Sequence, residues 1–166
     1  MRAWRIYSHT APHALAPGFD PLDGAGGRVS ANRWNEPGHP VIYAAANASL
    51  AALETLAHLV HPTDFGERTI LEVELPDDVE SVSVEQLLRL RADAPADDPE
   101  LLTRQFGTQW LREKRSLALL APSFVMPYDR SVLINPLHEN AGRIELVRQE
   151  LVRLDARLAA GWPSAT

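Results

Sequence analysis

The chain has 166 residues, of which 45% are hydrophobic and 23% charged, and this balance predicts one globular domain over residues 1–166, with its core at about 3–158. The net charge of −6 argues against a general nucleic-acid binder and against an anionic membrane surface as partner. The chain has no cysteine, which excludes disulfides and thiolate zinc sites, and it shows neither a signal peptide nor a membrane-spanning apolar stretch, so we expect a cytoplasmic protein.

The first third of the chain predicts two short strands and a helix. "AWRIY" (3–7) is typical of a strand, and the glycine- and proline-rich stretch 8–40 predicts a long irregular connection, which in a compact domain is usually functional or disordered. "PVIYAA" (40–45) is typical of a short buried strand. Asn47 then occupies the expected N-cap position of a helix over 48–61.

The middle of the chain combines one strand with an acidic insertion. Residues 68–75 alternate polar and apolar side chains, as a half-buried strand does. Acidic residues dominate from 72 to 100. We expect an insertion at 76–100 that contains a small helix near 83–90 and the polar linker "ADAPADDPE" (92–100).

The last third predicts one helix and two strands before an ambiguous tail. Residues 99–115 are typical of a helix, and 116–123 and 131–136 of two strands joined by a turn. In the tail, 143–158, apolar residues recur at heptad-like spacing and favour a helix, although "ELVRLDARL" also fits a strand. Strands and helices in no strict alternation predict an α+β fold.

Glu54 is the carboxylate with the most informative position. On a helical wheel it borders the apolar stripe of helix 48–61, so it is either an ordinary glutamate on the helix flank or part of a pocket wall. Glu54, His58 and His61 share one face of that helix, which is compatible with a metal ion. The H-E-x-x-H pattern is absent and no further ligand is evident, so we expect no metal site.

Three other short motifs could carry a function, and the residues around each one indicate whether it does. The triplet "RWN" places Arg33 beside Trp34 ahead of a buried strand. The arginine is either a solvated loop residue or a clamp for an anion, and the tryptophan anchors the loop. Ser123 ends an apolar strand, but no G-x-S-x-G elbow surrounds it. "GAGG" at 24–27 lacks the preceding strand of a nucleotide-binding glycine loop.

Taken together and in order, these segments resemble a known family. "NRWNEPGHPVIYAAANASLAALETLAHL" resembles the central motif of RES-domain proteins, the toxins of RES–Xre toxin–antitoxin pairs. The arginine, glutamate and serine that give the family its name match Arg33, Glu54 and Ser123. The family's tyrosine matches Tyr43.

The resemblance extends toward both ends of the chain. "WRIY" resembles the family's opening strand with Arg5, "LINPLH" its late segment with Asn135 and His138, and "VRLDARL" its closing strand. Two positions depart from the family: "SANRWN" lacks the glycines usual before the arginine, and Leu154 replaces the closing phenylalanine. The resemblance implies an ADP-ribosyltransferase-like mixed β core with flanking helices, and a strand where periodicity alone favours a helix in the tail.

For function, the resemblance implies a toxin of a type II toxin–antitoxin system that consumes NAD+ by cleaving its nicotinamide–ribose bond. The acceptor is phosphate or water in an NAD+ phosphorylase or glycohydrolase, or a protein side chain in a protein ADP-ribosyltransferase. The implied partner is an Xre-family helix-turn-helix antitoxin, with no direct nucleic acid or membrane contact. Two other classes stay open: an inactive NAD-binding or interaction module, and a metal-dependent hydrolase on Glu54, His58 and His61.

The resemblance also implies a role for each residue of the motif. Glu54 would stabilise positive charge on the ribose, as a carboxylate does in glycoside cleavage. Arg33 would grip a phosphate with its planar fork, Tyr43 would offer a flat face to nicotinamide, and Ser123 would bond the ribose end. The implied catalytic residues are therefore Arg33, Tyr43, Glu54 and Ser123.

NAD, which is the substrate and needs no metal here, would be bound by a second, overlapping set. The members of that set are Arg5, Tyr7, Arg33, Tyr43 and Asn135. Because Arg5 and Arg33 would line the mouth of the site, we expect the antitoxin to plug it with an acidic group. The acidic stretch 72–100 would repel such a group, so we expect it to lie away from the mouth.

Overall fold

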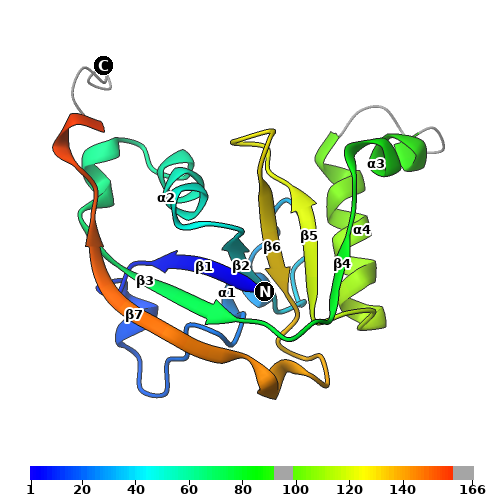
Figure 1. Ribbon diagram of the computed structural model, residues 1–166, viewed down its shortest axis with the longest axis horizontal. Coiled ribbons are helices and arrows are strands. Elements are labelled where there is room, and N and C mark those ends of the chain that lie inside the picture. The colour runs from blue at the N-terminus through cyan, green and yellow to red at the C-terminus, as the bar shows by residue number, and fades with distance from the viewer. Residues whose placement is uncertain (92–98, 159–166) are drawn as a thin grey trace.

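The computed structural model describes residues 1–91 and 99–158, and seven strands form one mixed sheet within it (Figure 1). The strand order is β4-β5-β6-β2-β1-β3-β7, and all neighbours are antiparallel except β4 and β5. The strands are β1 Arg2–Tyr7, β2 Ile42–Ala45, β3 Glu67–Glu74, β4 Val79–Ser81, β5 Ala118–Pro122, β6 Arg130–Ile134 and β7 Glu145–Arg153. The predicted strands at 3–7, 40–45, 68–75, 116–123 and 131–136 are confirmed, whereas the sequence analysis missed β4.

The described residues form four α-helices. They are α1 Ala25–Val29, α2 Ala48–Ala57, α3 Val84–Arg91 and α4 Pro99–Glu113. α2 starts after Asn47 as predicted, because the Asn47 side chain accepts a hydrogen bond from Leu50 N at 2.8 Å. It ends before the predicted residue 61, since His61 and Pro62 begin a separate 3-10 turn. Within the predicted linker 92–100, residues 92–98 lie outside the described part of the chain.

The long connection 8–40 is less irregular than we expected. It contains the 3-10 turn Pro12–Leu15 and the short helix α1. α1 lies close to the strand that follows, since a Cβ at Gly27 would crowd His39 O and Val41. Two further 3-10 turns, Ala141–Arg143 and Ala156–Leu158, flank β7. The close packing of Gly27 on His39 and Val41 brings the "RWN" triplet, which lies between them in the chain, back against the sheet.

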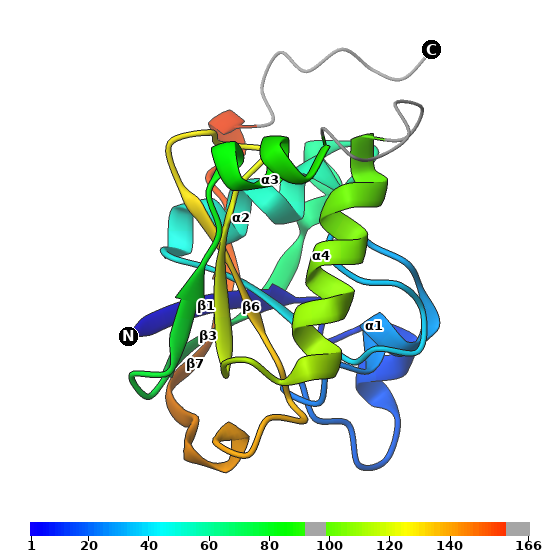
Figure 2. The same cartoon turned by 90° about the vertical axis from the view of Figure 1, so that its right-hand side faces the viewer.

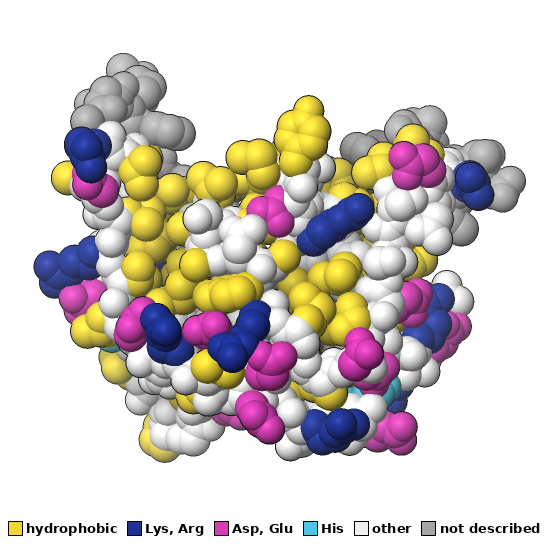
Figure 3. All heavy atoms as spheres, in the orientation of Figure 1, with side chains coloured by type: hydrophobic (Ala, Val, Ile, Leu, Met, Phe, Trp, Pro, Cys, Tyr) yellow, Lys and Arg dark blue, Asp and Glu magenta, His cyan; other side chains and the backbone are white. Residues whose placement is uncertain are grey.

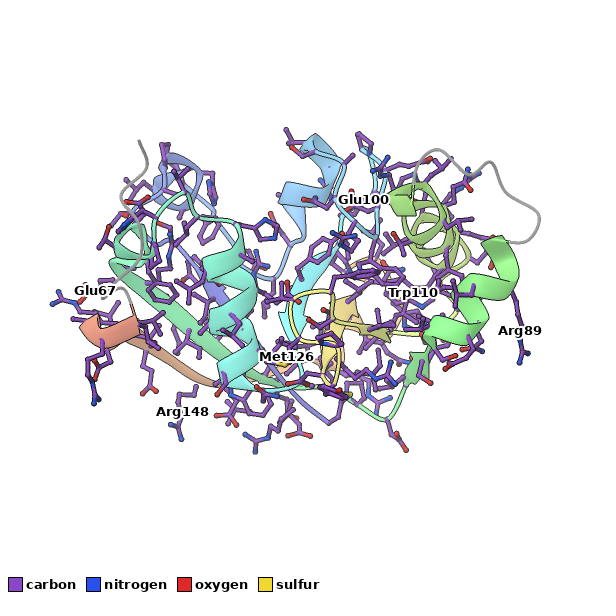
Figure 4. The ribbon with its side chains drawn as sticks, turned by 90° about the horizontal axis from the view of Figure 1, so that it is seen from above. Glu67, Arg89, Glu100, Trp110, Met126 and Arg148 are labelled. Carbon is purple, nitrogen blue, oxygen red and sulfur yellow. The ribbon has the colours of Figure 1, made fainter. Side chains whose placement is uncertain are left out.

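The two halves of the sheet are joined at one narrow place. β1 pairs along its whole length with β3, but it pairs with β2 only through Trp4 and Ala45. In both views β1 and β3 run across the direction of β5 and β6 (Figures 1 and 2). The sheet therefore turns sharply between β1 and β2, and α2 and α4 lie on either side of the β5–β6 hairpin (Figures 1 and 4).

α2 and α4 lie on the same face of β2. Tyr43 packs with Trp110 and Leu111 of α4, and Ala45 packs with Leu50 of α2. Residues 43 and 45 point to one face of a strand, so both helices cover that face. The alternate residues Ile42 and Ala44 belong to the core on the other face, with Val73, Val132 and others. Side chains that project from this face of β2 therefore lie between α2 and α4.

The tail is a strand, and the helix favoured by its periodicity is wrong. β7 pairs with β3 from Glu145–Glu74 to Arg153–Glu67, with a register shift at Glu72/Val73. β3 pairs with β1 on one side, and the backbone groups on its other side need partners as well. β7 supplies those hydrogen bonds, as the family resemblance implied. The spacing of apolar residues in the tail fits both a helix and a strand, and the pairing with β3 makes it a strand.

The α+β fold predicted from the sequence, a mixed sheet with flanking helices, is confirmed. In the described ranges 1–91 and 99–158, no helix is long and apolar enough to cross a membrane.

Candidate active site

Two serine hydroxyls, one directly after β5 and one on β6, meet one carboxylate oxygen of Glu54 on α2. The Ser123 hydroxyl donates to Glu54 Oε1 at 2.8 Å, and the Ser131 hydroxyl donates to the same oxygen at 3.2 Å. Both serines are buried, whereas Glu54 is partly exposed. No described residue donates to Glu54 Oε2, so one oxygen is fixed and the other stays available.

The Ser123 hydroxyl makes more hydrogen bonds than the Ser131 hydroxyl. Its hydroxyl oxygen accepts hydrogen bonds from Val125 N at 3.2 Å and Met126 N at 3.0 Å while its proton is given to Glu54. The hydroxyl thereby closes the turn after β5 and positions the carboxylate. Figure 4 shows this loop, labelled at Met126, between α2 and the helices α3 and α4.

The helix that carries Glu54 is tied to the hairpin that carries the serines. The Asn47 side chain caps α2 with its oxygen, and its amide donates to Asp129 Oδ2 at 2.6 Å. Ser123 N donates to Asp129 O at 3.1 Å, on the opposite side of the hairpin. One asparagine therefore fixes both the start of α2 and its distance from the β5–β6 hairpin.

Sequence analysis missed Ser131, although the sequence contains a signal for it. Ser131 lies opposite Ala121, and Ser123 is bonded to Asp129, so the two serines are diagonal neighbours across an antiparallel pair. Such neighbours share one face and lie within reach of the same group. The two serines that flank "FVMPYDR" would have suggested a shared partner.

The "RWN" triplet divides its side chains between core and surface. Trp34 is only 2% exposed and packs against Gly107 of α4, where a Cβ would overlap the Trp34 carbonyl. Asn35 is fully buried, and its amide donates to the carbonyls of Gly27, Ser30 and Glu36. Trp34 is thus the loop anchor that we expected, and Asn35 is a second anchor that we missed.

Tyr43 holds the same loop from the sheet. Its hydroxyl donates to Asn35 Oδ1 at 2.7 Å and accepts from Trp34 N at 3.2 Å. Burial raises the pKa of the Tyr43 hydroxyl well above its usual range, so the group stays a neutral donor. Its hydroxyl therefore positions the segment next to Arg33.

Arg33 projects outward between two partners. Its guanidinium lies 4.2 Å from the centre of the Phe124 ring, and Nη2 lies 3.1 Å from Glu100 Oε1. Phe124 follows Ser123 directly, so Arg33 and Glu54 are linked through adjacent residues of one loop. The expectation that the whole acidic stretch lies away from Arg33 is wrong for Glu100, because the start of α4 returns to this loop (Figure 4).

Arg5 and Tyr7 lie on β1. Arg5 Nη1 donates to the carbonyl of Tyr43 at 2.9 Å, beside the single pair that joins β1 and β2. Its Nε has no partner in the described structure, and burial lowers the pKa of this guanidinium below its usual range. The Tyr7 ring packs at 5.5 Å from the Phe19 ring. Contact of either residue with NAD stays a prediction.

Asn135 and His138 lie at the other end of β6 from Ser131. The buried Asn135 amide donates to Leu111 O at 3.0 Å and its oxygen accepts from Leu137 N. His138 lies 3.4 Å from Asp78. These contacts join the end of β6 to α4 and to the chain before β4. The structure therefore does not bring Asn135 to Glu54, and its role in NAD binding stays a prediction.

The residues of α2 do not converge on a metal site. The His61 ring lies 2.6 Å from the Thr63 hydroxyl and caps the following 3-10 turn. His58 ends α2 and is exposed. Among the described residues, no group of three histidine or acidic side chains is placed to hold an ion.

The geometry around Glu54, Ser123 and Arg33 can be set against known proteins. A model of the RES domain family matches residues 2–155. This chain belongs to the RES domain family. The resemblance stated from the sequence is therefore confirmed.

Several members of the RES domain family are similar along most of their length. The chain is 36% identical over 143 residues to the "Prs ADP-ribosylating toxin" of Sphingobium sp., covering 86% of each protein. It is 41% identical over 143 residues to a "Toxin Res" of Pseudomonas putida, covering 85% of this chain and 88% of that one. A "Toxin Res" of Yersinia enterocolitica is 33% identical over 117 residues, 70% of this chain and 76% of that one.

A solved structure shares the fold. The chain resembles a protein in the MbcT-MbcA toxin–antitoxin complex of M. tuberculosis, with a TM-score of 0.66 over 91% of this chain and 83% of that one. The two sequences are 16% identical, so the likeness concerns the fold alone.

The two departures from the RES pattern have structural counterparts. Where glycines are usual before the arginine, this chain has "SANRWN", and the buried amide of Asn35 binds that segment through Ser30 O. Leu154, in place of the closing phenylalanine, lines a hollow with Leu56 and Phe65. The substituted leucine thus still faces apolar neighbours.

Proposed function

We propose that this chain is the toxin of a type II toxin–antitoxin system and that it consumes NAD+ by breaking the nicotinamide–ribose bond. The observation that carries the proposal is Glu54, which has one oxygen fixed by two serine hydroxyls and the other free. The names of the relatives support it, since one is called an ADP-ribosylating toxin and others Toxin Res.

Glu54 has the position that cleavage of this bond requires. As the C1′–N bond breaks, its electron pair leaves with nicotinamide, and positive charge develops on the ribose. A carboxylate with a fixed orientation stabilises that charge without having to reorganise. We assign this role to the free Oε2, while Ser123 and Ser131 hold Oε1 in place. Ser123 is then a positioning residue, because its proton and lone pairs are engaged within the loop.

Arg33 has the position and chemistry of a phosphate clamp. Its planar guanidinium is stacked on Phe124, which fixes its orientation but leaves its edge available for hydrogen bonds. Its present partner, the Glu100 carboxylate, is itself an anion with two oxygens. We infer that a phosphate group of NAD+ replaces Glu100 on Arg33 when the substrate binds. Tyr43 supports this residue by holding Trp34 and Asn35.

The acceptor of ADP-ribose distinguishes two forms of the proposal. With water or phosphate, an acceptor oxygen bonds to the ribose carbon that carried nicotinamide, which is C1″ of the product, nicotinamide leaves and the acceptor gives up a proton, so the products are free ADP-ribose or its 1″-phosphate. With a protein side chain, the same step yields a modified protein, nicotinamide and a proton. The name of the ADP-ribosylating relative keeps the second form open, and the partly exposed Glu54 is compatible with either.

The partner that we propose is an Xre-family antitoxin that presents an acidic group or a chain-end carboxylate to Arg33. The structural neighbour, a member of a toxin–antitoxin complex, supports a partner of this kind. Such a group would take the place of Glu100 and so compete with NAD+. Co-purification with the product of the neighbouring gene, followed by NAD+ turnover of the complex, tests inhibition by occlusion.

Expression of the chain without a partner tests the proposed function in cells. We expect growth to stop and cellular NAD+ to fall, and we expect Glu54→Gln to prevent both. Growth arrest with unchanged NAD+ would support protein ADP-ribosylation instead. No effect of the wild-type chain on growth, NAD+ or protein modification would leave the inactive binding module as the better reading.

A further inference from the structure

β7 is a long strand at the edge of the sheet. β3 pairs with its inner side, and no strand of the described residues pairs with its outer side (Figure 1). Leu146, Val147 and Leu151 are 52%, 43% and 60% exposed. An edge of this kind presents unpaired N–H and C=O groups to any strand that fits, and proteins usually protect it with charged side chains, lysine above all, with proline or with a cover. β7, "ELVRQELVR", has no proline or lysine, and its charges are of both signs.

The order of residues in β7 is complementary to itself. When a second copy runs antiparallel with Gln149 at the centre, Arg148 faces Glu150 of that copy and Glu150 faces its Arg148. Each of these two charged residues therefore meets the opposite charge. The apolar residues Val147 and Leu151 flank the charged pairs. Opposite charges and aliphatic pairs directly across an antiparallel ladder are the favourable combinations.

This complementarity depends on one register. If the centre moves by one residue, either Arg148 or Glu150 faces its own copy, and like charges directly opposite are destabilising. On the inner side of the strand Arg148 lies 3.5 Å from Glu72, and along the strand it lies 3.7 Å from Glu150. Glu150 lies opposite the apolar Ile70 of β3. The Arg148 side chain of a second copy would give Glu150 an opposite charge directly across the ladder.

The charged side chains are exposed enough to accept such a partner. The side chains of Arg148, Glu150 and Arg153 are 62%, 56% and 72% exposed. Figure 3 shows acidic and basic side chains side by side over the region of β3 and β7, with apolar side chains above them. The register shift leaves Val147 without a partner on β3, and β7 is regular from Arg148 to Arg153. The Arg148–Glu150 pairs about Gln149 therefore lie in the regular part of the strand.

We propose that this chain forms a homodimer in which β7 pairs antiparallel with β7 of a second copy about Gln149, joining the two sheets into one. Figure 4 shows Arg148 at the rim, apart from Met126 and Glu100. The dimer therefore leaves the residues of the candidate active site uncovered. The inference concerns a different surface from the proposed function and does not depend on it.

Sedimentation of the full chain tests the dimer through charge reversal. We expect a mass of twice 18.3 kDa for the wild type. Arg148→Glu alone and Glu150→Arg alone each place like charges opposite one another in the dimer, so each variant should sediment as a monomer. Mixed in equal amounts, the two variants restore both opposite-charge pairs and should sediment as a heterodimer.

The mixed sample separates loss of the interface from loss of the fold, because a misfolded variant would not associate when mixed. A monomeric wild type would overturn the proposal, and so would single variants that dimerise as well as the wild type. Monomers that fail to associate on mixing would also overturn it. Arg112→Glu, on α4, is the control and should leave the dimer intact.

Discussion

Glu54 and Arg33 differ in how firmly the fold holds them. Two buried hydroxyls fix one oxygen of Glu54, whereas Arg33 is partly exposed and, among the described residues, contacts the Phe124 ring face and Glu100. A group that stabilises charge on the reacting atom has to be in place beforehand, while a phosphate clamp can exchange one anion for another. The two residues therefore call for different experiments.

Replacement of Arg33 tests whether the planar fork is needed. Arg33→Lys should weaken NAD+ binding nearly as much as Arg33→Ala, because lysine keeps the charge but loses bidentate bonding and stacking on Phe124. Titration of NAD+ against both variants measures this. If the lysine variant binds NAD+ like the wild type, Arg33 supplies only diffuse charge.

Glu100 should act in the opposite direction. Glu100→Gln keeps the shape of the side chain and removes the anion that occupies Arg33, so NAD+ should bind more tightly. The gain should not exceed about five-fold, since an exposed ion pair is worth at most about 1 kcal/mol. Glu113→Gln, at the other end of α4, is the matched control. If Glu100→Gln binds NAD+ with unchanged or weaker affinity, Glu100 does not compete with NAD+ for Arg33.

The two serines should differ in importance. Ser123→Ala removes a donor from Glu54 and also the acceptor of two backbone N–H groups, whereas Ser131→Ala removes one longer bond. We expect Ser123→Ala to lower kcat by roughly 100-fold, as loss of one preorganised donor does, and Ser131→Ala to lower it less. The KM for NAD+ should change little in both. A larger loss in Ser131→Ala would reverse the assignment of the positioning residue.

At the scale of elements, α4 and the Arg33 loop touch through a glycine. A Cβ at Gly107 would overlap the carbonyl of Trp34. Gly107→Ala should therefore lower the free energy of unfolding by about 1–3 kcal/mol, despite the better helix propensity of alanine. Thermal or urea unfolding measures the change. Gly142→Ala, where a Cβ meets open space, is the control and should be nearly neutral.

Prediction from the sequence succeeded where one local pattern decides. Asn47 and the helical run behind it place α2, and alternation places β3. It failed where a distant partner decides. The tail has spacing that fits a helix, but β3 offers it an open edge and makes it a strand. β4 has three residues and is a strand because it pairs in parallel with β5. Its own sequence is too short to show the alternation typical of a strand.

The candidate site shows the same limit. Arg33, Glu54 and Ser123 were named from a resemblance, and the fold brings Glu54 and Ser123 into contact across 69 positions of sequence. Neither the ion pair of Arg33 with Glu100 nor the contact of Ser131 with Glu54 could be read from spacing. The first depends on the packing of the Arg33 loop on α4, and the second on the pairing of β2 with β6. Asn135 was named from the same resemblance and lies at the far end of β6.

At the scale of the whole molecule, the sheet has two functional regions in this account. The pairing of β2 with β6 brings α2, which follows β2 directly, to the β5–β6 hairpin around Glu54, and no strand of the described residues pairs with the outer edge of β7. Because the two regions are separate, variants in β7 should convert the dimer to a monomer without changing NAD+ turnover. Variants of Glu54 should change NAD+ turnover and leave the dimer intact.

The central claim is that the Glu54 carboxylate drives cleavage of the nicotinamide–ribose bond, and turnover of NAD+ by the purified chain tests it most directly. Nicotinamide release should be measured for the wild type and for Glu54→Gln, with and without phosphate, together with the affinity of each for NAD+. We expect the wild type to release nicotinamide and Glu54→Gln to bind NAD+ with similar affinity while its kcat falls by at least about 100-fold. Turnover by Glu54→Gln at a rate near that of the wild type would contradict the account.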